Sequence, residues 1–354
     1  MKTVRVALGE HAYSIEIEKG LLDSVGTRVA ALVPKAKRAV IISDTNVAPL
    51  YGARLQSSLQ AAGLPAQLIT IEAGEQSKNM EVLHNVLEKM AESGLTRTDV
   101  LVTLGGGVVG DLGGFAAASY MRGIPFIQVP TSLLSQIDSS VGGKVAVDLK
   151  AGKNLAGAFY QPKGVFIDPE CLRTLTIRFL HDGLAEVIKT GCIFDEELFE
   201  LINSFVSDEE LLDRADEVVY RCVGFKARIV EEDEFDTGRR GLLNFGHTLG
   251  HAVEQHFGYS GFTHGEGVAI GMYQLTARTE SLGMTPAGTA ARIKAILEKY
   301  QLPTEPGCDK SQLLEAMSRD KKKNGNNITL IVLKRIGEAV LHKIPWTEVS
   351  RYLG

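Results

Sequence analysis

The sequence predicts an α/β N-terminal domain, with a parallel-type sheet and helices on both faces, followed by an all-α C-terminal domain. Short apolar runs alternate with helix-length amphipathic stretches through the first half, an order typical of parallel sheets covered by helices. From about residue 171 helical periodicity dominates. At 354 residues the chain is also long for a single core. We therefore expect two domains, at 1–177 and 178–354.

The predicted elements follow one another in a regular rhythm. An alternating segment at 4–18 predicts a strand pair that turns near Gly9. Further strands are expected at 39–43, 67–72, 100–104, 124–129, 145–149 and 165–168, with helices at 47–62, 79–92 and 108–120. The second half predicts helices at 172–192, 196–205, 209–231, 242–257, 267–282 and 287–300, with a late strand at 325–333.

Three consecutive glycines, Gly105, Gly106 and Gly107, join the apolar strand at 100–104 to the next helix. Glycine lets the backbone turn sharply and lets a ligand approach main-chain N–H groups. The N-terminus of the following helix favours an anion such as a pyrophosphate. The spacing is not GxGxxG, so an NAD site here would be a non-standard, Rossmann-like one. An ordinary tight turn explains the glycines equally well.

Polar residues follow the neighbouring strands as well. Asp44 ends one strand, and Glu75 and Lys78 follow the next. Ligands of open parallel sheets bind at the carboxyl ends of the strands, so these side chains are expected to gather near the glycines. A role as a helix cap would explain Asp44 as well as a role in ligand binding.

Composition narrows the class of protein. The formal net charge of −5 gives no support for a nucleic-acid surface. The N-terminus lacks the apolar core of a signal peptide, and no apolar run approaches membrane-spanning length. The four cysteines are far apart and form no CxxC pair, which favours reduced thiols in a cytoplasmic protein.

A glutamate and three histidines form the candidate metal site. Glu186 lies on a helix face with Lys189, and His247 and His251 share another face, with His264 opening the next helix. One glutamate with two histidines is a ligand set of catalytic zinc, because it leaves a coordination position open. The residues alone do not decide between His251 and His264 as the second histidine ligand.

Cationic side chains are the second candidate for function. They lie at element ends or beside the motifs above, where they would suit a phosphorylated, carboxylated small molecule. Solvated surface positions are the competing interpretation. The set comprises Arg122, Lys144, Lys153, Lys189, Lys226, Arg239, Arg240, Lys321 and Lys322.

Nearly the whole chain resembles the 3-dehydroquinate synthase family of sugar phosphate cyclases. The resemblance is carried by GEQSKN at 74–79, LGGGVVGDLGGFAAASYMRG at 104–123, VPTSLLSQIDSSVGGK at 129–144, GKNLAGAFYQP at 152–162, LAEVIKTG at 184–191, NFGHTLGHAVE at 244–254, HGEGVAIGM at 264–272 and RDKK at 319–322. Several long motifs in one order are far more specific than a glycine loop alone.

The resemblance implies site residues and cofactors. Zn²⁺, or Co²⁺ in its place, would bind Glu186, His247 and His264, with His251 facing the substrate. NAD would bind Asp44, Asn46, Glu75, Lys78, Gly105, Gly106, Gly107, Asp111, Thr131, Ser132, Lys144 and Lys153. The substrate would meet Arg122, Asp138, Lys144, Asn154, Lys189, Lys226, Arg240, Asn244, His251 and one lysine of the Lys321–Lys322 pair. Arg239 is adjacent to Arg240, so either of the two could be the residue that aligns with the family's substrate arginine.

The implied reaction converts 3-deoxy-D-arabino-heptulosonate 7-phosphate into 3-dehydroquinate and phosphate. Its steps are transient oxidation by NAD, β-elimination of phosphate, re-reduction, ring opening and an intramolecular aldol. The family also suggests a homodimer. Three alternatives remain: a metal- and NAD-dependent polyol dehydrogenase, a sister cyclase for an uncarboxylated sugar phosphate, and a non-catalytic NAD-binding module.

Overall fold

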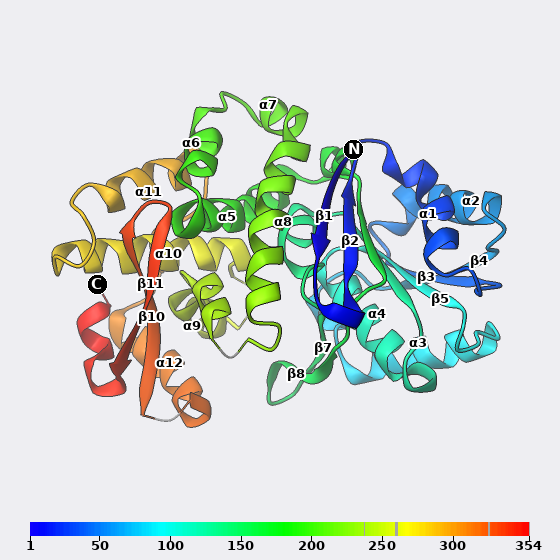
Figure 1. The fold of residues 1–354 in the computed structure, drawn as a ribbon. Helices are drawn as coiled ribbons and strands as arrows, with labels where there is room; N and C mark the ends of the chain where they lie inside the picture. Colours follow the sequence, from blue (N-terminus) through cyan, green and yellow to red (C-terminus); the bar gives the residue numbers. More distant parts are fainter. Residues whose placement is uncertain (237, 259–260, 325, 354) are drawn as a thin grey trace. The chain divides into compact units, whose positions relative to one another are not determined.

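Two compact units make up the chain, coloured along the sequence in Figure 1. The computed structural model describes residues 1–236, 238–258, 261–324 and 326–353, and the side chains of residues 318–325 lie outside this description. Unit 1 comprises Met1–Leu175 and Leu212–Phe235, and unit 2 comprises Thr176–Leu211 and Asp236–Gly354. The predicted boundary after residue 177 assigns residues 212–235 to the second domain, whereas the structure groups them with the first. The chain therefore passes between the units three times, not once.

A seven-stranded sheet forms the centre of unit 1, in the order β1-β2-β9-β6-β5-β3-β4. Only the β1–β2 pair is antiparallel, and all other neighbours are parallel. The strands are β1 (Lys2–Val6), β2 (Tyr13–Ile17), β3 (Ala39–Asp44), β4 (Ala66–Ile71), β5 (Val100–Gly105), β6 (Phe126–Pro130) and β9 (Gly164–Ile167). A separate antiparallel hairpin consists of β7 (Lys144–Leu149) and β8 (Gly152–Phe159). The strand β8 was not predicted.

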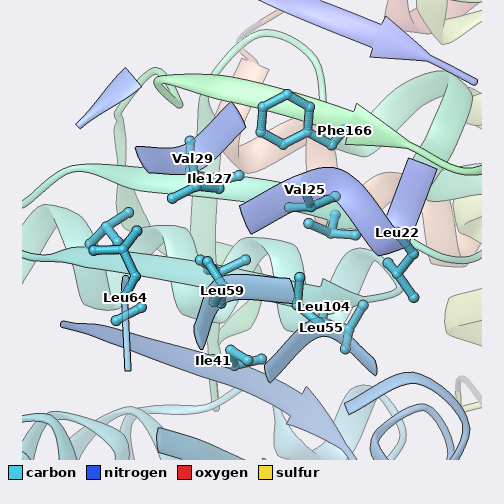
Figure 2. Packing of buried hydrophobic residues seen from close by; sticks show 14 of the residues in the cluster. Leu22, Val25, Val29, Ile41, Leu55, Leu59, Leu64, Leu104, Ile127 and Phe166 are labelled. Carbon is cyan, nitrogen blue, oxygen red and sulfur yellow. The ribbon is translucent and has the colours of Figure 1, made fainter. Parts of the chain in front are cut away.

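Both faces of this sheet are buried, which explains the continuous apolar runs of its central strands. On one face Ile41 and Leu104 pack with Leu22, Val25 and other residues of the cluster shown in Figure 2. On the other face Ile42 belongs to a second cluster, which also contains side chains of α3 and α4. Alternate strand residues thus enter opposite cores, so the prediction of helices on both faces is confirmed.

The helices of unit 1 are α1 (Val25–Leu32), α2 (Ala53–Ala61), α3 (Met80–Glu92), α4 (Gly107–Ser119) and α8 (Ala215–Glu232). Asn79 caps α3, because its side chain accepts hydrogen bonds from the backbone N–H groups of Glu81 and Val82. The short helices are η1 (Gly9–His11), η2 (Leu21–Ser24), η3 (Ala48–Gly52), η4 (Glu75–Ser77), η5 (Tyr120–Arg122), η6 (Ser135–Ser139) and η7 (Pro169–Thr174). The helix predicted at 47–62 is therefore the π-type turn η3 running into α2.

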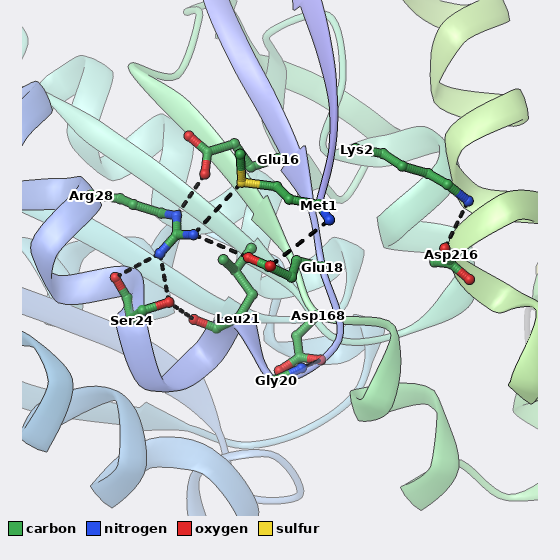
Figure 3. A network of polar contacts seen from close by, with 10 residues as sticks. All are labelled: Met1, Lys2, Glu16, Glu18, Gly20, Leu21, Ser24, Arg28, Asp168 and Asp216. Carbon is green, nitrogen blue, oxygen red and sulfur yellow. Dashed lines mark hydrogen bonds and ion pairs between the residues drawn. The ribbon is translucent and has the colours of Figure 1, made fainter.

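The helix α8 packs against β1 and η6 of unit 1 with a buried face. Lys2 on β1 pairs with Asp216 on α8 at 2.7 Å, as Figure 3 shows. Elsewhere in the same view, Arg28 joins α1 to β2 through Glu16, at 2.6 Å. Contacts between segments so far apart in the chain carry no sequence signal of their own, so helical periodicity alone predicts that α8 belongs with its sequence neighbours.

Unit 2 is mainly helical. Its elements are α5 (Ile177–Phe194), α6 (Glu196–Ser204), η8 (Arg239–Asn244), α9 (His247–His256), α10 (His264–Ser281), α11 (Thr289–Lys299), α12 (Lys310–Asn324), β10 (Asn327–Arg335), β11 (Glu338–Pro345) and η9 (Trp346–Tyr352). The helix α7 (Asp208–Asp213) extends from unit 2 into unit 1. The late strand was predicted, but α12 and the partner strand β11 were not, so the all-α expectation is modified by one hairpin. No described helix combines the length and the apolarity of a membrane span.

Candidate functional site

The glycine turn of unit 1 lies where β5 passes into α4. Gly105 ends the strand and Gly107 begins the helix. The backbone N–H of Thr131 donates to the carbonyl of Gly105 at 3.0 Å, which places the residues after β6 beside the turn. A Cβ added to Gly106 would lie 3.5 Å from the Ser132 hydroxyl. The structure thus brings together the glycines, Thr131 and Ser132, at a helix N-terminus suited to an anion.

Four charged side chains assemble next to this turn. The Lys78 ammonium lies 3.0 Å from Glu75 and 3.3 Å from Asp111, and Lys153 lies 3.7 Å from Glu75. Burial raises the pKa of Asp111 to about 6, against the opposing effect of Lys78. Burial alone would lower the pKa of Lys78, but Asp111 and Glu75 outweigh it and raise that pKa. These four predicted NAD residues therefore form one network.

Asp44 occupies the carboxyl end of β3, the strand next to β5. Its Oδ1 accepts hydrogen bonds from the backbone N–H groups of Asn46 and Val47, both at 2.9 Å. Asp44 therefore stabilises the turn after β3 and is not the N-cap of the following helix η3, whose N-cap is Val47. These hydrogen bonds hold the carboxylate at the edge of the sheet where the glycine turn lies.

The predicted substrate residues of unit 1 fall into separate places. Lys226 on α8 pairs with Asp138 on η6, so these two are brought together from distant parts of the sequence. Lys144 begins β7, and Asn154 lies on β8 with a left-handed backbone (φ 56°). Arg122 is exposed and follows α4 at the end opposite Gly107, about 20 Å along the helix. The length of α4 therefore keeps Arg122 away from the glycine turn.

In unit 2, one face of α5 binds the first turn of α10. Arg178 makes two hydrogen bonds of 2.8 Å to Glu266, and one turn later Asp182 accepts from the backbone N–H of Gly265 at 2.6 Å. Glu186 follows Asp182 by one further turn on the same face. The same docking that anchors the start of α10 therefore directs Glu186 towards His264.

Close packing of α9 on α10 brings His247 to the same place. A Cβ on Gly271 would lie 1.9 Å from the carbonyl oxygen of Gly246, and one on Gly250 would lie 2.8 Å from the carbonyl of Gly267. Only glycine permits so short a distance between two helix backbones. Glycines four residues apart on each helix thus allow the two histidine-bearing helices to meet.

Two of the predicted metal ligands, His247 and His264, face a buried oxygen of the third, Glu186. Glu186 Oε1 lies 3.5 Å from His247 Nε2 and 3.6 Å from His264 Nε2, and it has no hydrogen-bond partner. Ligand atoms about 2.05 Å from a tetrahedral zinc ion are separated by about 3.3 Å, close to the spacing seen here. An unpartnered buried carboxylate oxygen facing two imidazole nitrogens fits a divalent metal. Lys189 pairs with the second carboxylate oxygen, Oε2.

The pKa shifts of this group have a consistent cause. Burial would raise the pKa of Glu186, but Lys189 and the two histidines hold it well below its usual range. Burial and Lys189 lower the pKa of His247 well below its usual value. Burial opposes charge on His264, yet the adjacent carboxylates of Glu186 and Glu254 raise its pKa to about 10. A divalent cation would take the place of the proton that this set otherwise attracts.

A second set, His251, Glu254 and His264, also has ligand atoms close enough to hold a metal. His264 is common to both sets, and the set that contains Glu186 and His247 includes His264 and not His251. Glu254 was not among the predicted residues. A signal for it exists, since residues 247, 251 and 254 lie at the spacing of one helix face.

A cavity of about 700 Å³ in unit 2 opens beside these histidines. Asn244, His247 and His251 line it, together with Lys343 and Trp346 from the unpredicted hairpin region. Of the two adjacent arginines, Arg240 is buried and Arg239 is exposed. The side chains of Lys321 and Lys322 lie outside the described residues.

Comparison with known proteins gives consistent matches along the chain. The families described as 3-dehydroquinate synthase N-terminal and 3-dehydroquinate synthase C-terminal match residues 68–182 and 183–323. A curated 3-dehydroquinate synthase of Clostridium acetobutylicum is 51% identical over 354 residues, which are 100% of this chain and 99% of that protein.

Two solved structures share the fold. A 2-deoxy-scyllo-inosose synthase complexed with carbaglucose-6-phosphate, NAD⁺ and Co²⁺ has a TM-score of 0.87 at 24% identity, covering 99% of this chain and 98% of its own. A 2-epi-5-epi-valiolone synthase from Streptomyces hygroscopicus with NAD⁺ and Zn²⁺ bound has a TM-score of 0.86 at 28% identity, covering 96% and 95%.

Proposed function

We propose that this chain, which belongs to the 3-dehydroquinate synthase family, converts 3-deoxy-D-arabino-heptulosonate 7-phosphate into 3-dehydroquinate and phosphate. It is a phosphate-eliminating carbon–oxygen lyase that uses NAD and a divalent metal. The end-to-end identity with the clostridial synthase carries this proposal. The fold likeness to two sugar phosphate cyclases supports the same class of reaction.

Bound NAD supplies reversible acceptance of a hydride, and a metal held by Glu186, His247 and His264 supplies a Lewis acid for the substrate oxygen. Oxidation of a carbinol makes the neighbouring C–H acidic, so phosphate can leave by β-elimination. NAD held at the glycine turn would supply a hydride acceptor that gives the hydride back within one turnover, so no net oxidation would result. The protein mainly contributes orientation, charge placement and retention of the intermediates.

The residues of unit 1 serve the cofactor in this proposal. The glycine turn and the N-terminus of α4 bind the pyrophosphate through backbone N–H groups. The network of Glu75, Lys78, Asp111 and Lys153 and the edge residue Asp44 bind the remaining polar parts of NAD. Support comes from the position of all these groups around the carboxyl ends of β3 and β5.

The cationic and amide side chains serve the substrate. The Lys189 ammonium pairs with the carboxylate of Glu186, and His251 and Asn244 line the cavity next to the metal ligands. Ammonium and guanidinium groups would hold the phosphate and carboxylate without acting as general bases, since a dianion nearby favours their protonated form. The proposed substrate residues are these cations and amides together with Asp138 and His251, namely Arg122, Asp138, Lys144, Asn154, Lys189, Lys226, Arg240, Asn244 and His251.

The test supplies heptulosonate phosphate, NAD⁺ and Zn²⁺, and follows phosphate release together with NADH absorbance. The cyclase releases one phosphate per substrate with no net build-up of NADH. NADH equal to the substrate consumed, without phosphate, would establish a polyol dehydrogenase. Turnover of an uncarboxylated sugar phosphate in place of the heptulosonate would establish a sister cyclase. His264→Ala serves as the control for metal-independent phosphate loss.

Location and assembly complete the proposal. The described structure contains no disulfide between the four cysteines, and burial raises the pKa of Cys171 to about 12, which fits unreactive thiols in a reducing cytoplasm. A homodimer is proposed from the family resemblance, and analytical ultracentrifugation at two or more protein concentrations tests it.

A further inference from the structure

Resting on the metal site of the proposed function, we propose that Glu254 is a positioning residue that sets the tautomer and orientation of His264. Glu254 Oε1 lies 3.1 Å from His264 Nδ1. The carboxylate is almost fully buried, with 4% of the residue exposed. It comes from α9, whereas His264 begins α10, so the contact joins the two helices whose glycines permit their close packing.

The chemistry of the two partners decides where the proton lies. An ionised carboxylate can only accept hydrogen bonds. His264 Nδ1 therefore donates a proton to Glu254, and in the neutral imidazole the lone pair is left on Nε2. That nitrogen is the one that faces Glu186 Oε1, at 3.6 Å. Without an acceptor at Nδ1, the ring could carry its proton on either nitrogen and could turn away from Glu186.

His247 provides an internal comparison. Its Nδ1 lies 3.2 Å from the backbone carbonyl of Phe245, and its Nε2 lies 3.5 Å from Glu186 Oε1. Both histidines thus have an acceptor at Nδ1 and present Nε2 to the same oxygen. One acceptor is a neutral backbone group and the other is a charged side chain. Only the second can be removed by mutation, and it also increases the basicity of its histidine.

The competing assignment makes Glu254 a metal ligand together with His251 and His264. The two assignments differ in which atom of His264 is used. In the positioning role, Glu254 occupies Nδ1 and leaves Nε2 for the metal. The carboxylate of Glu254 then lies behind the ring, on the side away from Glu186, and His251 stays outside the ligand set.

The experiment measures Zn²⁺ affinity by competition with a chromophoric chelator, with no substrate present. Glu254→Leu removes the acceptor and should weaken Zn²⁺ binding by about 10- to 100-fold. Glu254→Gln keeps an acceptor oxygen in a side chain of the same shape, so it should retain affinity to within about fivefold of wild type. His251→Ala should leave affinity within about twofold. This pattern of results would show that Glu254 binds Nδ1 of His264 and is not a metal ligand.

Glu280→Gln is the matched control, because Glu280 lies on the same helix α10 and accepts backbone hydrogen bonds from Gly288 and Ala290 at 2.9 and 2.8 Å. It should lower the thermal midpoint and leave Zn²⁺ affinity unchanged. The Co²⁺ absorption bands of Glu254→Gln should keep the wild-type positions, and this variant is the readout should Glu254→Leu fail to fold.

Two results would overturn the positioning role. One is Zn²⁺ affinity of a folded Glu254→Leu within twofold of wild type. The other is loss of binding in both Glu254→Gln and His251→Ala, with altered Co²⁺ bands in the former, which would make both residues ligands. A wild-type protein that binds no metal would instead refute the metal site itself. Phosphate release by wild-type enzyme tests the proposed function separately.

Discussion

Glycines build the candidate site in both units, but they solve a different problem in each. At the β5–α4 turn of unit 1, Gly106 and Gly107 keep the backbone open to a ligand, and a Cβ at Gly107 would meet the movable Ser139 hydroxyl at 3.2 Å. At the α9–α10 contact of unit 2, Gly271 meets the backbone of Gly246 itself. The first arrangement tolerates small changes of shape. The second holds two helices at a fixed separation, on which the spacing of the metal ligands depends.

The largest effect should follow from removing a metal ligand. Glu186→Gln, His247→Ala and His264→Ala should each weaken metal binding by more than about 100-fold, since loss of a mere outer partner already costs about 10- to 100-fold. Chelation should abolish activity, and added Zn²⁺ or Co²⁺ should restore it. Metal content per chain is the measurement. Full metal content in His264→Ala with loss in His251→Ala would reverse the ligand assignment.

Alanine at one glycine of each unit tests the comparison directly. Gly271→Ala should lower the free energy of unfolding by about 3 kcal/mol, because the new Cβ must displace a helix backbone, and it should weaken metal binding as well. Gly107→Ala should change stability by less than about 1 kcal/mol and raise the KM for NAD. Denaturant melts and cofactor titrations supply the two measurements. Equal effects of both variants on metal affinity would remove the distinction between the two glycine sites.

The next effect concerns one cation in each unit. Lys189→Met and Lys144→Met should each reduce kcat/KM about ten- to a hundredfold, which corresponds to loss of a charge-assisted contact of about 1.5–3 kcal/mol. Folding and zinc content should remain intact in both. Lys189 is buried beside Glu186, whereas Lys144 is exposed. If Lys144→Met had normal kinetics, a solvated surface position of Lys144 would explain it, but the same explanation would not apply to Lys189→Met. Near-normal kinetics in both variants would show that the substrate has been assigned to the wrong cations.

The smallest effect is a change in pH dependence at Asp111. Its pKa is about 6 in the folded chain and about 3.9 in an unfolded one. The folded state therefore retains a proton that the unfolded state loses, and stability falls as the pH rises from about 4 to about 6. Asp111→Asn should remove this fall. At pH 7 it should raise the free energy of unfolding by about 1–2 kcal/mol, a net gain that includes the loss of the ion pair between Lys78 and residue 111. Chemical denaturation from pH 4 to 7 checks the slope. A slope unchanged from wild type would contradict the raised pKa.

Much of unit 1 follows from local sequence. Apolar runs such as 100–104 predict strands because both faces of the sheet are covered, and strands of one direction place Asp44 and Gly105 at one edge. The strand β8 has no apolar run of this kind, and its residues occupy only intermediate and exposed positions. The sequence also predicts a single domain boundary, because α8 has ordinary helical periodicity and its contacts with β1 and η6 assign it to unit 1.

Unit 2 shows the opposite balance. The residue types Glu186, His247, His251 and His264 predict a metal site from the sequence, but their spacing does not choose among the histidines. In the structure His247 and His264 both face Glu186 Oε1, although the set containing His251 remains close enough to bind. Glu254 escaped prediction because a glutamate within an amphipathic helix is ordinarily a solvated surface residue.

The sequence by itself determined the α/β and helical halves, the glycine turn, and the chemical types of the residues available for a cofactor, a metal and an anionic substrate. These features depend on local periodicity and on neighbours within a few positions. Tertiary structure alone decided that α8 packs with the sheet, that Lys226 meets Asp138, and that His264 lies between Glu186 and Glu254. Each of these contacts joins segments far apart in the chain, where distance depends on how whole helices pack and not on the spacing of residues along the sequence.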